Sequence, residues 1–406
     1  MTDVLLRGGL PWGLGAPADI LVRDGRIARV IPRGRPPGPA APAAETPRTP
    51  EAFGAPGAMV FDVEGQLILP GLVEAHCHLD KTLYGGPWVP HSADDTLADR
   101  IATDLGRRAE LGVPSVARIG ALLRQMSEAG TTHVRTHTDI DPAAGLRGVE
   151  AVREAAAGCH VDVRQVAFPQ HGLLTNPGTA ELLEEALKSG VEAVGGLDPA
   201  GIDRDPVRHL DLIFGLAGRY GTHLDLHLHD GGSLGGWELE LIIERTKALG
   251  LGGKVAVSHA YALGQLDEAY QDRLVQGLAE ADVAVVTAAV YNFPVPPIKK
   301  LRAAGVTVAV GHDGIRDLWG PYGSGDMLER AMHVAYRSTF RRDDDIELAL
   351  EAATVGGARA LGLDDYGLAP GDRADLVVVP AGSPAEAVVV HPGRTLVMKD
   401  GVVLHN

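Results

Sequence analysis

The segment "GLVEAHCHLDKTL" (71–83) ends an apolar run with two histidines, His76 and His78, and continues directly with Asp80 and Lys81. If the run is a β-strand, side chains two residues apart point to the same face, so both imidazoles could reach one ion. Neutral imidazole nitrogens suit zinc and similar divalent ions. We interpret the histidine pair as half of a metal site.

Short runs rich in β-branched residues recur along the chain, and each is followed by a stretch with helical periodicity. The strand candidates are residues 71–78, 132–139, 161–168, 191–198, 223–230, 254–260, 283–290 and 306–313. Repeated βα units of this kind are typical of α/β proteins with a parallel sheet. Eight of them predict a (β/α)8 TIM barrel over residues 71–362, whose functional groups gather at the C-terminal ends of the strands.

Polar residues that could bind a metal or take part in catalysis lie at the ends of these predicted strands. The residues at or just beyond the ends of the runs are His76, His78, Asp139, Gln170, Asp198, His227, His259 and Asp313. A single His-x-His motif also occurs in ordinary polar contacts. Histidines and an aspartate gathered at one barrel rim are more specific, because they supply ligands for one ion and leave a position open for water.

The two ends of the chain have a different pattern. Residues 20–31 and 396–404 each place Asp-Gly between two extended apolar runs, which indicates a two-residue hairpin turn. We therefore expect a small composite β-sandwich built from residues 1–70 and 363–406. Residues 33–58 are rich in Pro and Ala, and we expect them to form a flexible loop that packs no core.

The composition narrows the choice of partners. A formal net charge of −16 and the lack of a basic tract argue against nucleic acid and anionic membranes, so a small-molecule substrate is expected. The two cysteines, Cys77 and Cys159, exclude a disulfide framework and a thiolate zinc site. No signal-like or membrane-spanning segment is present, which favours a cytoplasmic protein. A homo-oligomer is left open.

Several motifs carry a resemblance to a known family. They are "PGLVEAHCHLD" (70–80), "RTHTDID" (135–141), "VAFPQHG" (166–172), "GGLDPA" (195–200), "HLHD" (227–230), "SHA" (258–260) and "IRDLWGPYGSGDM" (315–327). The chain resembles the amidohydrolase superfamily, and within it the bacterial cytosine deaminases and the aminohydrolases of s-triazine breakdown. The resemblance implies a barrel with a small β-sandwich and metal-dependent hydrolysis of a small nitrogen heterocycle.

The resemblance also implies the metal ligands. One divalent ion would be held by His76, His78, His227 and Asp313, with His259 beside the water bound to it. The fourth predicted strand ends in "GGLDPA" without a lysine, so the carbamylated-lysine bridge of two-metal relatives is not expected. The ligand types favour zinc, with iron or manganese as alternatives.

Proton transfer needs further residues. A divalent ion lowers the pKa of bound water to about 7, and His259 can pass a proton from this water to the leaving amine, assisted by Asp313. Asp230 stands where the cytosine deaminases carry a glutamate that protonates the ring. Because its side chain is shorter, both a catalytic role and a structural role as a loop anchor are open. Gly314 replaces a second acid of the deaminases, which removes a polar contact and opens room.

Three residues are candidates for substrate binding. Gln170 can donate to and accept from a ring edge, or cap a loop. Lys81 can meet a ring oxygen or an anionic substrate, or pair at the surface with the neighbouring aspartate. Trp319 is either an apolar wall of the site or a buried core residue. We expect His137 and Asp139 to hold the barrel rim or to orient the metal-bound histidines.

These residues predict a metal-dependent aminohydrolase, or deaminase, that hydrolyses an exocyclic C–N bond on a pyrimidine, an s-triazine or a similar heterocycle. The alternative is an amidohydrolase that opens a cyclic amide. A metal-free assembly protein is a weaker alternative because the ligand set is intact. "GGSLG" matches the serine elbow around Ser233, but an α/β-hydrolase also needs an open sheet and a later acid and histidine. Compact zinc deaminases need a cysteine pair that the chain lacks.

Overall fold

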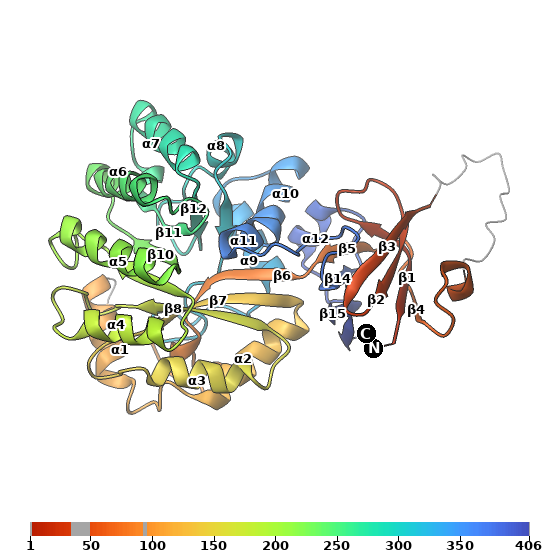
Figure 1. Ribbon diagram of the computed structural model, residues 1–406, viewed down its shortest axis with the longest axis horizontal. Helices are drawn as coiled ribbons and strands as arrows, with labels where there is room; N and C mark the ends of the chain where they lie inside the picture. Colours follow the sequence, from red (N-terminus) through yellow and green to blue (C-terminus); the bar gives the residue numbers. More distant parts are fainter. Residues whose placement is uncertain (1, 34–48, 92–95, 406) are drawn as a thin grey trace.

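The computed structural model describes residues 2–33, 49–91 and 96–405. Two parts are visible in Figure 1: a large barrel surrounded by helices, and a smaller β part that contains both ends of the chain. Strand β6 (Leu72–Cys77) leads from β5 (Leu67–Pro70) of the smaller part into the barrel. The predicted TIM barrel with a small β structure from both chain ends is confirmed.

The barrel consists of eight parallel strands arranged in chain order. After β6 they are β7 (Thr131–Asp139), β8 (Asp162–Phe168), β9 (Ala193–Leu197), β10 (His223–Leu228), β11 (Val255–His259), β12 (Val283–Thr287) and β13 (Val308–Val310). A parallel bridge between Cys77 and Asp313 joins the ends of the first and the eighth strand. The C-terminal strand ends therefore meet at one rim, as the fold requires.

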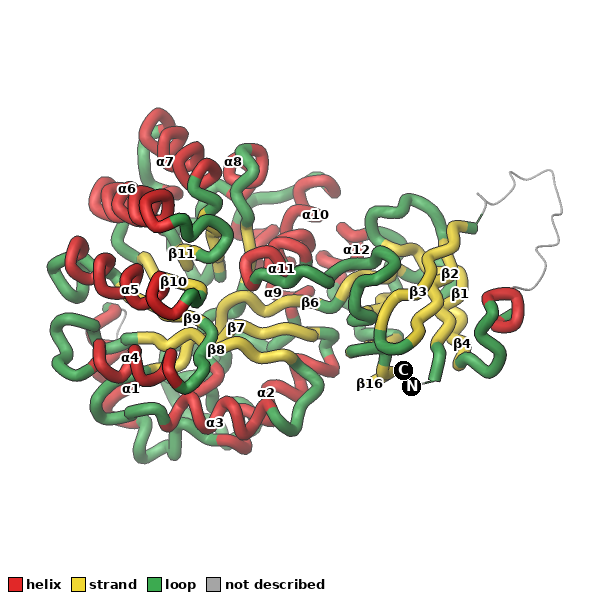
Figure 2. The backbone as a smooth tube through the Cα atoms, in the orientation of Figure 1, coloured by secondary structure: helices red, strands yellow, loops and turns green. Residues whose placement is uncertain are grey.

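Helices cover the outside of the strands (Figure 2). They are α1 (Leu97–Arg107), α2 (Val116–Glu128), α3 (Arg147–Ala156), α4 (Thr179–Lys188), α5 (Pro206–Tyr220), α6 (Gly232–Leu249), α7 (Glu268–Glu280), α8 (Ile298–Ala303), α9 (Met327–Arg337), α10 (Asp343–Ala352), α11 (Val355–Leu361) and α12 (Pro384–Val390). Short 3-10 helices are η1 (Pro50–Phe53), η2 (Leu79–Lys81) and η3 (Tyr261–Gly264). Over the described parts of the chain, no helix has the length and apolar content to cross a membrane.

Strand β10 shows how the sequence sorts its side chains between the two faces of the barrel wall. Leu224, Leu226 and Leu228 alternate with polar residues and belong to the large apolar core shared with the helices. Because side chains alternate along a strand, Asp225 and His227 point to the opposite face, the inside of the barrel. The alternation thus places polar groups inside the barrel and a ligand candidate near its rim.

The small β part is one hydrogen-bonded path in the order β16-β15-β14-β5-β1-β2-β3, with β4 paired to β1. Its strands are β1 (Val4–Pro11), β2 (Ala18–Arg23), β3 (Arg26–Pro32), β4 (Met59–Asp62), β5, β14 (Leu376–Val379), β15 (Leu396–Lys399) and β16 (Val402–His405). Residues from both chain ends share a buried apolar core, among them Leu6, Ile20, Leu376 and Met398. This is the composite β-sandwich predicted from the sequence.

Both predicted hairpins have the expected turns. The central residues Asp24 and Gly25 have φ of 50° and 75°, and Asp400 and Gly401 have φ of 51° and 76°. Positive φ at both positions is the requirement of a type I′ turn, which Asp-Gly satisfies at low cost. The turn chemistry therefore determines where these strands reverse.

The Pro/Ala-rich segment only partly falls within the described chain. Residues 34–48 lie outside the described residues, so the flexible loop expected there stays a prediction. For residues 49–58 the expectation is wrong: Phe53 and Ala55 are buried against Leu5 and Leu21 of the sheet. The aromatic ring of Phe53 packs this part against the sheet, because it buries a large apolar surface.

Candidate metal and substrate site

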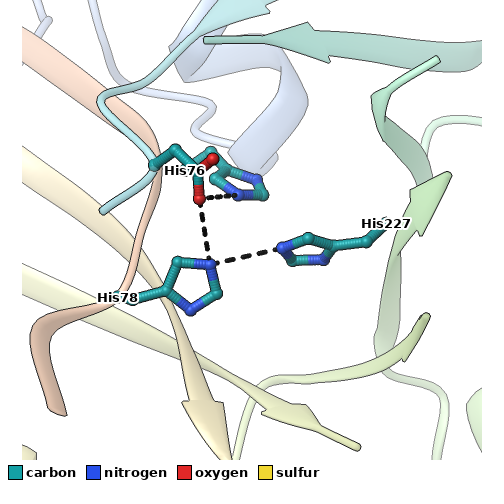
Figure 3. Close-up of side chains that lie close together, drawn as sticks. His76, His78 and His227 are labelled. Carbon is teal, nitrogen blue, oxygen red and sulfur yellow. Dashed lines mark hydrogen bonds and ion pairs between the residues drawn. The ribbon is translucent and has the colours of Figure 1, made fainter. Parts of the chain in front are cut away.

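Four of the predicted ligands converge at the C-terminal rim of the barrel. His76 lies near the end of β6, His78 follows it, His227 lies on β10, and Asp313 follows β13. Their ligand atoms all lie within 4.8 Å of one another. His78 Nε2 is 3.2 Å from Asp313 Oδ1 and 3.3 Å from His227 Nε2, and His76 Nε2 is 3.6 Å from the same Asp313 oxygen. Figure 3 shows the three imidazoles arranged around this point.

The other ring nitrogens of two histidines define which tautomer each adopts. Ser258 Oγ donates to Asp225 Oδ1 at 2.7 Å, so it accepts from His76 Nδ1 at 2.8 Å. His78 Nδ1 donates to the carbonyl oxygen of His137 at 3.1 Å. Each Nε2 then carries no proton and faces the ligand atoms of the other residues in the group. The inner partners thus orient the first two imidazoles.

This arrangement fits a divalent ion. Burial, followed by the charge of Lys81, lowers the pKa of His78 to about 4, and burial together with the surrounding histidines lowers the pKa of His227 well below its usual value. Neutral imidazoles and a carboxylate are the forms that bind metal. Their lone pairs face one another in a buried site, which is unfavourable unless a cation lies between them. The donor set is the one expected for zinc, iron or manganese.

Backbone strain coincides with the site. Asp198, His259 and Asp313 lie at or just beyond the ends of their strands and have φ of 36°, 69° and 66°, in the left-handed region that residues other than glycine rarely adopt. Each such residue costs on the order of 1 to 3 kcal/mol and is found mostly at functional sites. The strain turns the chain sharply at the rim, where all three residues lie around the site.

His259 lies beside the ligand group. Its ring centroid is 5.0 Å from that of His76, 5.1 Å from His227 and 4.2 Å from His229. Both its ring nitrogens are buried and have no hydrogen-bond partner among the described residues. Burial lowers the pKa of His259 well below its usual value. The imidazole is therefore neutral.

A cavity of about 590 Å³ opens next to the ligand group and is lined by His78, His227 and Asp313. This volume falls in the range of sites for small organic ligands. Aromatic side chains form much of the remaining lining, including Phe168, Tyr261, Tyr291, Phe293 and Trp319. The predicted ligands thus stand in the wall of a largely apolar pocket.

All three predicted substrate-binding residues line this cavity. Lys81 Nζ donates to Gln170 Oε1 at 2.6 Å and pairs with Asp139 Oδ1 at 2.9 Å. Lys81 is only 5% exposed, so it is not the surface lysine of the alternative interpretation. Asp80 instead accepts a hydrogen bond from the Asp139 backbone at 3.0 Å. The buried indole nitrogen of Trp319 has no partner within the described chain, which leaves a donor beside the cavity.

Asp230 does not contribute to the lining of the cavity. Its Oδ2 accepts a hydrogen bond from the Gly201 backbone at 2.8 Å. Burial, followed by the charge of Asp198, raises the pKa of the Asp230 carboxyl group. Burial and then Asp230 raise the pKa of Glu238 to about 8. The contacts favour the structural alternative, in which Asp230 anchors the loop after β9, and a catalytic role stays untested.

The space beside Gly314 is filled. A side chain at this position would begin 2.2 Å from Asp317 Oδ2, so the expected additional room is absent. Asp317 is buried and accepts hydrogen bonds from the backbone nitrogens of Trp319 and Gly320 at 2.8 and 3.0 Å. Burial raises the pKa of Asp317 to about 7. An acid from further along the chain therefore occupies the region next to Gly314.

His137 packs against the ligands behind the cavity, with its ring centroid 4.2 Å from that of His76. One cavity residue, His229, was missed in the sequence. Its Nδ1 lies 2.8 Å from Asp198 Oδ2, and its ring faces His259. The available signal was spacing, since His227 and His229 repeat the His-x-His pattern of the first strand.

A model of the amidohydrolase family matches residues 113–405, more than half of the chain. This chain belongs to the amidohydrolase family. The amidohydrolase is 31% identical over 357 residues to N-isopropylammelide isopropyl amidohydrolase of Pseudomonas sp. (strain ADP), covering 85% of this chain and 87% of the relative.

Two solved structures are also similar to this amidohydrolase. One is N-isopropylammelide isopropylaminohydrolase from Burkholderia multivorans ATCC 17616, with 46% identity, a TM-score of 0.91, and coverage of 100% of this chain and 99% of the other. The second is 5-methylcytosine deaminase from Klebsiella pneumoniae liganded with 5-fluorocytosine, with 28% identity, a TM-score of 0.83, and coverage of 99% and 97%. The resemblance inferred from the motifs is confirmed.

Proposed function

We propose that this amidohydrolase is a one-metal aminohydrolase that hydrolyses an exocyclic C–N bond on a nitrogen heterocycle such as an s-triazine or a pyrimidine. The observation that carries the proposal is the convergence of His76, His78, His227 and Asp313 at the wall of one cavity. The similarity to an isopropylaminohydrolase and to a cytosine-type deaminase supports this reaction class. In the reaction, water adds its oxygen to the ring carbon and the C–N bond breaks.

The four converging residues would hold the ion, with zinc favoured and iron or manganese as alternatives. When bound, a divalent ion supplies water of lowered pKa and hence a nucleophile at neutral pH. Ser258 and the His137 carbonyl fix the ring orientations of His76 and His78, and such outer partners raise metal affinity.

His259 would carry the proton. Because the amine leaves only after its nitrogen is protonated, a neutral base near the reacting carbon has to accept a proton first and return it later. The neutral imidazole of His259, without other partners among the described residues, is suited to both steps. Asp198 fixes His229 against it. We assign Asp230 a positioning role through the loop that contains Asp198 and Gly201.

Gln170, Lys81 and Trp319 would bind the ring. The Gln170 amide can face a ring edge with both a donor and an acceptor, and its oxygen is held by Lys81. The charge of Lys81 is balanced by Asp139, which suits a neutral ring carbonyl better than a second anion. The Trp319 indole adds an apolar surface and a free donor. Together these groups select a flat heterocycle with polar edges.

The test is a screen for released ammonia and amines over pyrimidines, purines, pterins and s-triazines, with and without a chelator. Turnover that disappears with the chelator and returns with zinc supports the proposal. Loss of the heterocycle without release of ammonia or amine indicates ring opening instead, the alternative reaction. A protein that carries no metal and releases no amine from any compound contradicts both.

A further inference from the structure

One helix brings a row of basic side chains to the cavity. Arg330, His333 and Arg337 of α9 all line it. These positions are three and four residues apart, so they lie on the same face of the helix. The row belongs to neither the ligand group nor the Lys81–Gln170 contact. It therefore requires a separate explanation.

The two arginines have few partners. Arg330 Nη1 donates to the Ala288 carbonyl at 2.9 Å, and Arg337 Nη2 donates to the Phe293 carbonyl at 2.6 Å. The Nε of each guanidinium is buried without a hydrogen-bond partner in the described chain. Within residues 2–33, 49–91 and 96–405, neither arginine forms an ion pair, and the adjacent Glu329 carboxylate accepts from Ser324. Arg330 is only 7% exposed.

A buried charge without a counter-ion is energetically unfavourable. The carbonyl contacts satisfy part of the hydrogen-bonding capacity of Arg330 and Arg337, but they bring no negative charge. A guanidinium offers a planar set of donors that matches a carboxylate particularly well. Because no described carboxylate is ion-paired with either arginine, a ligand in the cavity can supply this partner.

We propose that the substrate carries a carboxylate on the substituent attached to the heterocycle, and that Arg330, assisted by Arg337, binds it. The inference rests on the proposed function for the reacting end of the substrate. A cavity of about 590 Å³ has room for a ring and such a substituent. The stacked rings of Tyr261 and Phe293, whose centroids are 5.2 Å apart, also line the cavity and provide an apolar surface for the substituent. The leaving amine would then be an amino acid rather than a simple alkylamine.

The experiment compares two probes that differ in one group. Both are dihydroxy-s-triazines, one with an isopropylamino group and one with a 1-carboxyethylamino group, in which a carboxylate replaces one methyl. Amine release gives kcat/KM for each probe, and isothermal titration calorimetry gives Kd independently of turnover. We expect the full-length metal-loaded protein to prefer the carboxylate probe about tenfold or more in both measurements, because hydrogen bonds between charged groups are strong.

Substitution then tests the assignment to α9. Arg330→Gln should lower the preference for the carboxylate probe about tenfold or more, and Arg330→Lys should restore part of it. Arg342→Gln, at an exposed arginine outside the cavity, is the matched control and should leave the preference unchanged. If Arg330→Gln does not fold, as judged from its thermal transition, the preference for the carboxylate probe is measured in Arg337→Gln and in the wild-type protein instead. Arg337→Gln should then show the lower preference.

The outcomes separate this inference from the proposed function. If the protein releases amine from the isopropyl probe but does not favour the carboxylate probe in kcat/KM or in Kd, the inference is overturned. The proposed function then still stands. Tight carboxylate binding that Arg330→Gln abolishes, without any amine release, supports the anion site and contradicts the proposed reaction. Failure of the wild-type protein to bind the carboxylate probe overturns the inference.

Discussion

The Asp198 carboxylate holds the imidazole of His229 through Nδ1 at a distance of 2.8 Å. The same carboxylate accepts the backbone N–H of His229 at 2.5 Å, so both ring and backbone are fixed. This contact sets His229 against His259, with 4.2 Å between the ring centroids. An aspartate at the end of β9 thereby positions a cavity residue after β10, and through it the proposed proton carrier.

Asp198→Asn should weaken catalysis without removing metal. The amide keeps the size of the side chain but loses its charge, and hydrogen bonds with charged groups are worth about 1.5 to 3 kcal/mol. We expect kcat/KM to fall about tenfold or more. Metal analysis of the purified variant is the control, and a normal kcat/KM would show that the contact has no part in catalysis.

His227→Ala should deplete the metal itself. Removing one of the four proposed ligands leaves an incomplete set, so inductively coupled plasma analysis should find well under one ion per chain in the variant. His160→Ala, at an exposed histidine, is the matched control and should retain the wild-type metal content. Full occupancy in His227→Ala would mean that the four residues are not the ligands.

His259→Asn should keep its metal but lose activity. His259 belongs to no ligand group identified in the described chain, so metal content should match that of the wild-type protein. Loss of the proton carrier should lower kcat about 10² to 10⁴-fold, the usual contribution of general acid–base catalysis. Comparison of metal content and kcat in the same preparation separates this role from ligation.

Local patterns allowed much of this molecule to be predicted. The eight barrel strands follow from β-branched runs, and the type I′ hairpins at Asp24 and Asp400 follow from Asp-Gly, because these signals act over a few neighbouring residues. The candidate ligands were found at the predicted strand ends, since a parallel barrel brings the ends of its strands together. The family resemblance then narrowed them to the set of four.

The remaining contacts depend on which distant side chains share a cavity. Lys81 pairs with Asp139 rather than with its neighbour Asp80, and Asp317 fills the space beside Gly314. Neither choice has a local signal, because it depends on the path of the loops at the rim. The arginines of α9 were missed for a related reason: helical spacing alone does not tell which face of a helix meets a pocket.

The stability of the protein should depend on Glu238 in neutral and basic solution. Burial and Asp230 raise the pKa of Glu238 to about 8 in the folded state, above its value of about 4.3 in an unfolded chain. The folded state therefore retains a proton that the unfolded state releases, so stability decreases as the pH rises from about 4.3 to about 8.

Glu238→Gln removes this titration while keeping an oxygen for the Ala200 backbone N–H, which Glu238 Oε1 accepts at 2.8 Å. Denaturant unfolding at pH 5 and pH 8 should show the variant gaining stability relative to wild type at the higher pH. Glu244→Gln, at an exposed position of the same helix, should show no such difference. A constant difference between wild type and Glu238→Gln at both pH values would contradict the raised pKa.

Gly314→Ala should damage the cavity wall without affecting the helices or the core. The new methyl group would begin 2.2 Å from Asp317 Oδ2, so the carboxylate has to move and its hydrogen bonds to the Trp319 and Gly320 backbone are strained. Trp319 then shifts, and because it is proposed to contact the ring, KM should rise more than kcat falls.

The matched control is Gly215→Ala, on the exposed surface of α5 with nothing within 4 Å of the added methyl. It should keep wild-type kinetics and gain up to about 1 kcal/mol of stability, because alanine has the higher helix propensity. Equal kinetics in the two variants would show that the contact between Gly314 and Asp317 does not shape the substrate site.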